Sequence, residues 1–190
     1  MDAALDAGAA GLVHAAGAAR LGSFVDNEAM GERSVVDVGV TATVELCRSL
    51  VPPMIAAARA GGQRAMFITV ASTAAFVPVP RFAVYAASKA FVLSLTEAIA
   101  AELSDEPIDV LCTCPGATRT AFGHRAGFAR SHLPGAMSPD TVADRALRQL
   151  GCATVAFTDR PSRLALTSLV KARRTLARGL DSAIGLAQRA

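Results

Sequence analysis

The feature that most constrains the fold is a short apolar run followed by a long apolar helix. Residues 65–70 (AMFITV) predict a buried strand. Residues 83 to about 103 predict a helix that is apolar almost all round, so it must pack on more than one neighbour. Residues 108–112 (IDVLC) then predict the next strand. Strands that alternate with helices in this way indicate a parallel sheet with flanking helices.

Further segments continue this alternation. Residues 9–14 predict a strand that ends in the turn at Gly17, and residues 152–157 predict a last, short strand. Helices are expected over 1–8, over 33–60, from Pro139 to about Leu150, and over 161–190. The predicted fold is therefore one α/β domain over residues 1–190, with about four parallel strands.

Two prolines lie inside the predicted helix over 33–60. A proline inside a helix has no N–H to donate, and its ring clashes with the preceding turn. We therefore expect this helix to end near Leu50, ahead of Pro52 and Pro53, and to restart after them.

Composition excludes several broad classes of protein. The chain of 190 residues is 52% hydrophobic and 18% charged, which argues against intrinsic disorder. Its formal net charge of +3 is too small to indicate a nucleic-acid partner. No basic leader is visible near Met1 and no uninterrupted apolar window is long enough to span a bilayer, so we expect a cytoplasmic protein. No C-x-x-C pair occurs, and Cys112 and Cys114 are expected to be buried apolar residues of a strand.

Three side chains in the stretch STAAFVPVPRFAVYAASK, residues 72–89, can share one proton-transfer reaction. Tyr85 and Lys89 are four residues apart, on one face of the predicted helix. Ser72 follows the 65–70 strand, at the edge where α/β sheets bind ligands. A phenol has a pKa of about 10 in water, and an ammonium one helical turn away favours its anion. An isolated Y-x-x-x-K pair is usually a plain solvated helix face, so the interpretation needs support from the rest of the chain.

Motifs along residues 12–120 supply that support. In chain order they are LVHAAG (12–17), VVDVGVTATVEL (35–46), VASTAAF (70–76), VYAASKAFVLSLTEAIAAEL (84–103), and IDVLC with CPGATRT (108–120). Together they resemble the short-chain dehydrogenase/reductase family, with a weaker resemblance towards Ala190. The resemblance implies a partial Rossmann-type, doubly wound parallel sheet.

The same resemblance implies an oxidoreductase that interconverts carbonyls and alcohols with NAD(P)(H). Ser72 would orient the substrate oxygen, Tyr85 would be the general acid/base, and Lys89 would lower the phenol pKa and hold the nicotinamide ribose. The substrate would be a small carbonyl or alcohol, and the helices over 33–60 and 83–103 would form a homo-oligomer interface. The implied cofactor-binding residues are Ala16, Gly17, Tyr85, Lys89, Pro115, Gly116, Thr118 and Thr120.

Two departures from the family pattern bear on activity. No two of the 15 glycines are separated by a single residue, so the G-x-G phosphate loop does not occur in this chain. The strand over 9–14 resembles the fourth of the family's sheet, so we expect a truncated chain that lacks the first βαβαβ half. Gly39 stands where the family has an asparagine that anchors a water in the proton relay. This glycine either interrupts the relay or allows close helix packing, and the sequence leaves both open.

Three functions follow from these observations. The first is a dehydrogenase/reductase that is impaired as an isolated chain, and the second is a non-catalytic remnant that acts as a dimerising scaffold or as a partner of a full-length homologue. The third and weakest is a peripheral membrane protein that uses the terminal helix. The sequence does not specify the substrate or the choice between NAD and NADP.

His124 and His132 lie in the loop between Gly116 and Ser138. Because no third ligand stands at metal spacing, we interpret them as ordinary polar residues of a substrate lid and expect no metal site.

The last predicted helix, over 161–190, is amphipathic and basic. A basic amphipathic helix can lie on an anionic membrane, but Arg173 projects from the apolar side, and such helices more often cover a core or a partner. Membrane contact is therefore the less favoured interpretation. The apolar side is expected to carry Leu166, Leu169, Leu176, Leu180 and Ile184, and the opposite side Arg163, Lys171, Arg174 and Arg178.

Overall fold

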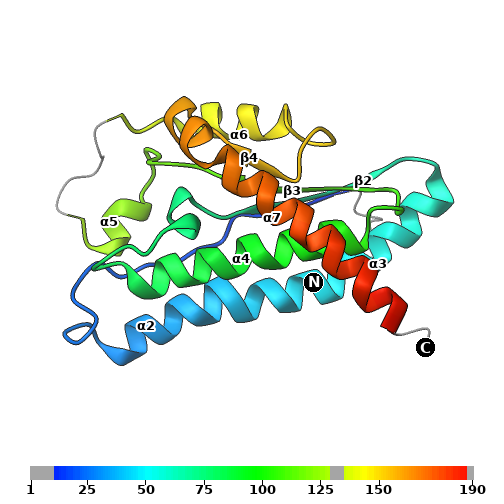
Figure 1. Cartoon of the computed structure of the whole chain (residues 1–190). Helices are drawn as coiled ribbons and strands as arrows, with labels where there is room; N and C mark the ends of the chain where they lie inside the picture. Colours follow the sequence, from blue (N-terminus) through cyan, green and yellow to red (C-terminus); the bar gives the residue numbers. More distant parts are fainter. Residues whose placement is uncertain (1–10, 129–134, 188–190) are drawn as a thin grey trace.

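The computed structural model describes residues 11–128 and 135–187, and these residues form one parallel sheet flanked by helices (Figure 1). The strands pair in chain order: β1 (Gly11–His14), β2 (Ala65–Val70), β3 (Ile108–Cys114) and β4 (Val155–Phe157). The register pairs His14 with Thr69 and Val70 with Thr113. The carboxyl ends of the strands therefore meet at one edge of the sheet.

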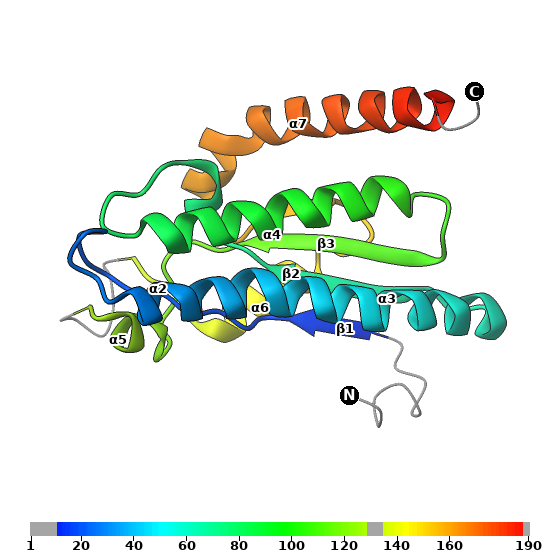
Figure 2. The same cartoon turned by 90° about the horizontal axis from the view of Figure 1, so that it is seen from below.

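Helices cover both faces of this sheet (Figure 2). One face is covered by a continuous helical segment made of α2 (Ala29–Val36), the π-helical turn η1 (Asp37–Thr41) and α3 (Ala42–Gly61), and by α4 (Ala83–Glu102). The other face carries α6 (Pro139–Leu147). The remaining elements are the 3-10 turn η2 (Thr73–Phe76), α5 (Phe122–Ala126), and α7 (Arg160–Ala187), which runs beside α4.

An apolar layer lies on each side of the sheet. On one side Phe67 of β2 packs among the buried side chains of α3, and on the other side Leu111 of β3 packs against Ala146 of α6. Phe67 and Leu111 are completely buried. Each such side chain contributes about 1.5–3 kcal/mol of burial free energy. Strands covered on both faces account for the nearly continuous apolar runs of β2 and β3.

Helix α4 is the most apolar helix of the described residues, and it is long and apolar enough to cross a membrane by length and composition. It packs on the sheet as a core helix, with Val92 and Leu93 each 1% exposed. Core helices of folded domains pass the same length and hydropathy test.

The strands predicted from the apolar runs are confirmed. β2 has the predicted bounds, β3 continues beyond the predicted 108–112 to Cys114, and β4 is shorter than the predicted 152–157. β1 is described from Gly11 onward, so the start of the predicted strand over 9–14 lies outside the described residues. The helix predicted over 1–8 also lies outside them.

The predicted helix break at the paired prolines is wrong. Helix α3 runs without interruption, with Pro52 and Pro53 inside it. Both prolines are exposed, whereas Leu50, Met54 and Ile55 are buried in the apolar layer on that face of the sheet. Burial of this apolar stripe outweighs the helical hydrogen bonds that two prolines remove.

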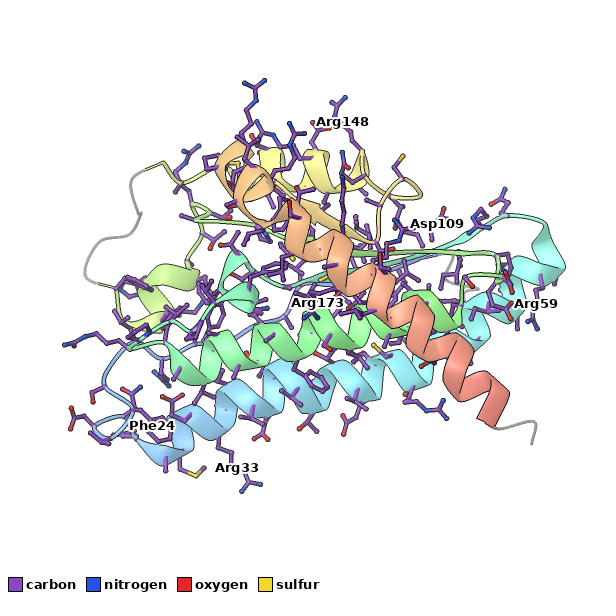
Figure 3. The ribbon with its side chains drawn as sticks, in the orientation of Figure 1. Phe24, Arg33, Arg59, Asp109, Arg148 and Arg173 are labelled. Atoms are coloured by element: carbon purple, nitrogen blue, oxygen red, sulfur yellow. The ribbon has the colours of Figure 1, made fainter. Side chains whose placement is uncertain are left out.

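Helix α7 is confirmed, but the side that faces the protein differs from the predicted one. The half-buried side includes Leu166, Val170, Arg173 and Ala177, whereas Leu176 is 67% exposed. Leu180 and Ile184, also assigned to the apolar side, lie outside the side chains that the structure describes. Arg173 does lie on the side of Leu166, and it points towards α4 (Figure 3).

Gly39 lies in η1, where this turn packs against α4. A β-carbon at Gly39 would lie 3.0 Å from Cβ and 3.1 Å from Oγ of Ser88. These distances are shorter than normal van der Waals contacts, so the structure supports the packing interpretation of this glycine.

We therefore predict that Gly39→Asn lowers the free energy of unfolding by about 1–3 kcal/mol, because the added side chain overpacks the contact with Ser88. Urea unfolding monitored by circular dichroism measures this change. Gly61→Asn is the matched control, since nothing lies within 4 Å of a β-carbon built at Gly61. Equal stability of Gly39→Asn and the native chain would show that packing against Ser88 does not require a glycine at position 39.

Candidate active site

The candidate site is built by loops that follow three parallel strands. β1 leads into Ala16 and Gly17, β2 into Ser72, and β3 into Pro115. Because the strands are parallel and in register, these loops lie at the same edge of the sheet. The amino-terminal turn of α4 brings Tyr85 to this edge (Figure 1).

Ser72 begins the η2 turn immediately after the strand. Its backbone is extended, and its Oγ accepts a hydrogen bond from the Ala74 amide at 3.1 Å. This cap fixes the hydroxyl near the end of β2. The same hydroxyl lies near the phenol of Tyr85 and lowers its pKa, which favours the charged form.

Tyr85 is enclosed by aromatic rings. The centre of its ring lies 4.6 Å from that of Phe82 and 5.4 Å from that of Phe122, which belongs to α5. Burial raises the pKa of Tyr85, and the Ser72 hydroxyl offsets part of this rise. Burial is the larger of these two effects on the phenol, and the sequence prediction that Lys89 lowers its pKa stays a prediction.

Lys89 is held almost completely inside the protein, with 5% of the residue exposed. Its Nζ donates a hydrogen bond of 2.8 Å to the carbonyl of Val70 at the end of β2. The same Nζ lies 5.9 Å from the centre of the Tyr85 ring. Burial lowers the pKa of Lys89, and the nearby Cys112 and Cys114 sulfur atoms counteract part of this shift.

Two of the predicted cofactor-binding glycines lie where a side chain would be obstructed. A β-carbon at Gly17 would lie 3.2 Å from Nζ of Lys89, and one at Gly116 would lie 3.1 Å from Oδ2 of Asp159. That Asp159 oxygen is buried and has no hydrogen-bond partner among the described residues. The site therefore has close backbone approaches on both sides, as a bound planar group would need.

The other predicted cofactor-binding residues follow β1 and β3. Pro115 is buried, and the hydroxyl of Thr118 donates to the Gly116 carbonyl at 3.1 Å. Thr120 is exposed, and its Oγ1 accepts from the Phe122 amide at 3.2 Å. Ala16 is exposed in the loop before Gly17. The structure thus brings Ser72, Tyr85, Lys89 and Gly17 together and places the others in the adjoining loops.

His14 is a buried group of this edge that the sequence analysis did not single out. Its Nε2 lies 2.9 Å from the hydroxyl of Thr43, which donates to the Gly39 carbonyl at 3.0 Å. Burial lowers the pKa of His14, and the positive charge of Lys89 lowers it further. The sequence signal that could have identified His14 is its place as the polar residue that ends the run LVH (12–14).

The structure describes one of the two histidines of the predicted lid. His124 is exposed on α5, and His132 lies outside the described residues. Within 11–128 and 135–187, the structure holds no cluster of three or more potential metal ligands.

Comparison with known sequences connects this geometry to a family. A family model described as short chain dehydrogenase matches residues 7–128. Dehydrogenase/reductase SDR family member 4 of Bos taurus is 38% identical over 101 residues, which make up 53% of this chain and 34% of that protein. Oxidoreductase UcpA of Escherichia coli (strain K12) is 34% identical over 123 residues, 65% of this chain and 44% of that protein.

Solved structures give the same result. A short-chain dehydrogenase from Sphingobium yanoikuyae in complex with NADPH superposes on 87% of this chain, and on 63% of its own, with a TM-score of 0.73 and 29% identity. A 3-ketoacyl-(acyl-carrier-protein) reductase from Brucella melitensis complexed with NADH superposes on 84% of this chain and 72% of its own, with a TM-score of 0.71 and 28% identity.

The chain spans less than half the length of the two curated relatives named above. The family match nevertheless covers most of the chain, including the strand ends and the helix that build the site. The parallel sheet, the ordered motifs and the sequence match lead to one conclusion: the chain belongs to the short-chain dehydrogenase family.

Proposed function

We propose that this chain contributes the catalytic part of an NAD(P)-dependent oxidoreductase that interconverts a small carbonyl compound and its alcohol. The observation that carries this proposal is the meeting of the Ser72 hydroxyl, the Tyr85 phenol and the buried Lys89 ammonium at one edge of the sheet. The complexes of related proteins with NADPH and NADH support the choice of cofactor class.

The residues present fit the nicotinamide end of such a cofactor. Gly17 and Gly116 let the backbone come close to Lys89 and Asp159, where a β-carbon would crowd those side chains. Lys89 and Tyr85 would hold the ribose, Ala16 and Gly17 would lie towards the adenine side, and Pro115, Gly116, Thr118 and Thr120 would line the nicotinamide and pyrophosphate. When bound, the nicotinamide supplies or accepts the hydride at the substrate carbon.

Tyr85 is suited to donate the proton in the direction of reduction. Because burial raises its pKa, the phenol stays protonated at neutral pH and can transfer its proton to the carbonyl oxygen of the substrate. The Ser72 hydroxyl would hydrogen-bond the same oxygen and orient it. Phe82 and Phe122 exclude water from the phenol, which strengthens the electrostatic effect of the nearby ammonium.

Lys89 has a positioning role as well as an electrostatic one. Its hydrogen bond to Val70 anchors the ammonium to the strand that also leads to Ser72. In the oxidative direction the phenol must lose its proton, and a positive charge close to the ring favours that anion.

A second candidate function is that of a non-catalytic partner of a longer homologue. The observations that favour it are the absence of a G-x-G loop from the sequence and the exposed face of β1, where Val13 is 54% exposed. In this alternative, α3 and α4 would serve as a self-association surface and the site residues would have no chemical role.

The first prediction concerns cofactor affinity. We expect this chain alone to bind NADPH or NADH with millimolar affinity at best, because no glycine-rich loop at a helix N-terminus is available to hold the pyrophosphate. Isothermal titration calorimetry with the purified chain measures this affinity. Micromolar binding would mean that another part of the chain replaces the loop.

The second prediction concerns the phenol. We would join this chain to the N-terminal segment of the Sphingobium yanoikuyae protein that precedes its matched region, and measure reduction of a panel of ketones and aldehydes from NADPH absorbance. Tyr85→Phe should lower turnover at least ~10²-fold with a much smaller loss of cofactor affinity, since the proton donor is lost while Lys89 still holds the ribose.

Ser94→Ala is the matched control for this experiment, because it removes an exposed hydroxyl from the same helix. Full activity of Tyr85→Phe would exclude the proposed mechanism. Absence of activity with every carbonyl, despite tight NADPH binding by the joined protein, would favour the non-catalytic alternative.

The third prediction follows from the buried cation. Since burial lowers the pKa of Lys89, the unfolded chain binds this proton more tightly than the folded protein does. Folding stability must therefore rise as the pH increases towards the ordinary lysine pKa of about 10.4. We expect the free energy of unfolding of the native chain, relative to Lys89→Met, to increase between about pH 7 and about pH 10.

Urea unfolding across this pH range measures the difference, and Lys171→Met is the control because Lys171 is exposed. The raised pKa of Tyr85 acts only above about pH 10, outside the range that is compared. Parallel curves for the native chain and Lys89→Met would contradict the assigned burial of the charge.

A further inference from the structure

A cavity of about 680 Å³ lies away from the candidate active site. It is open to solvent on one side and is lined by the carboxyl-terminal half of α4, the first residues of β3, the turn over 151–154, and α7. Figure 3 shows α7 passing over this region, with Asp109 and Arg173 labelled. Since its wall includes Ile108 at the start of β3, this α4–α7 pocket lies at the opposite ends of the strands from Ser72 and Pro115.

One wall of the α4–α7 pocket carries a buried carboxylate with an unused oxygen. The side chain of Glu97 is 9% exposed. Its Oε2 accepts a hydrogen bond of 2.8 Å from Arg173 Nε and forms an ion pair with Nη2 of the same residue at 2.7 Å. Its Oε1 is buried and has no partner among the described residues. A buried acceptor without a partner is costly, so this oxygen marks a place for an N–H or O–H donor.

The opposite wall carries two cations from α7. Lys171 and Arg174 line the pocket and are exposed. Neither forms an ion pair with any side chain that the structure describes. Asp109, the other acid of the lining, is paired with Arg64 at 2.8 Å. Because Arg173 and Arg64, which are outside the lining, already pair with Glu97 and Asp109, the charges of Lys171 and Arg174 favour an anionic group at the α7 side.

The rest of the lining is partly apolar, and it also includes the polar residues Ser104 and Thr154. Val110, Val155 and Val170 form part of the wall, together with Ala101 and Leu103. The volume lies within the range of about 300–1,000 Å³ that is usual for small-molecule sites. The pocket therefore combines one acceptor, two cations and an apolar surface.

We propose that the α4–α7 pocket binds a free amino acid with an apolar side chain. The ammonium would donate to Glu97 Oε1 once a small rotation of this carboxylate turns the buried oxygen towards the pocket. The carboxylate of the amino acid would lie between Lys171 and Arg174, and its side chain would pack on Val110 and Val155. A simple anion would leave the Glu97 oxygen unsatisfied, and a simple amine would leave the two cations unmatched. The site does not depend on the proposed oxidoreductase chemistry.

Three compounds of similar shape separate the contributions of the ammonium and of the carboxylate to binding. L-phenylalanine carries both charged groups, 3-phenylpropanoate lacks the ammonium, and 2-phenylethylamine lacks the carboxylate. We expect the ¹⁵N-labelled chain to show saturable shifts at the amides of Ala101, Val110 and Thr154 with phenylalanine at millimolar concentration. Phenylpropanoate should bind more weakly, and phenylethylamine more weakly still.

Variants test the assigned contacts. The double variant Lys171→Ala/Arg174→Ala should weaken phenylalanine binding about tenfold, as expected for two partly screened charges. Arg160→Ala is the matched control, since Arg160 is an exposed cation of α7 outside the pocket lining and should not alter binding. Glu97→Gln should reduce the affinity for phenylalanine to that for phenylpropanoate.

Cys152 provides an independent measurement, because it is an exposed free thiol that lines the pocket. Phenylalanine should slow its alkylation by N-ethylmaleimide. If Glu97→Gln fails to fold, the three probes on the native chain still decide the question. The proposal is overturned if none of them shifts the pocket amides, if phenylpropanoate binds as tightly as phenylalanine, or if the double variant binds phenylalanine normally.

Discussion

The hydrogen bond from the Lys89 ammonium to the Val70 carbonyl joins the fold to the site. Val70 ends β2, and its position is fixed by pairing with Thr113 of β3. A slip of one residue in this register would turn the side chains of β2 to the opposite faces of the sheet and move the carbonyl away from α4. The apolar contacts of Val92 and Leu93 hold α4 against the sheet. Sheet register and helix packing together therefore determine where the charge lies.

Most of the sheet could be predicted from the sequence, because strands buried on both faces leave continuous apolar runs. The prediction failed at Pro52 and Pro53, where a local rule competed with tertiary burial. The two prolines lie on the solvent side of α3, while the opposite side packs against the sheet. A sequence window around the prolines does not contain the partners that decide this competition, since the sheet residues Leu12, Phe67 and Ile108 lie elsewhere in the chain.

The candidate site was predictable in its members but not in its electrostatics. The spacing of Ser72, Tyr85 and Lys89 identified the trio, and the structure brings these residues to one edge. The rise in the Tyr85 pKa depends on desolvation, to which Phe122 of a different segment contributes. Gly39 shows the same limit, because the contact that requires a glycine is made by Ser88 on another helix. Such long-range contacts leave no periodic signal in the sequence.

The aromatic enclosure of Tyr85 has a spectroscopic consequence. The chain contains no tryptophan, and Tyr85 is its single tyrosine. The intrinsic tyrosine emission of the protein therefore arises from one ring, which lies within 5.9 Å of the Lys89 ammonium and against Phe82 and Phe122. Its fluorescence reports directly on the candidate active site, whereas a ligand in the α4–α7 pocket occupies a region with no fluorophore of its own. The molecule thus carries an optical probe at one of its two sites without any label.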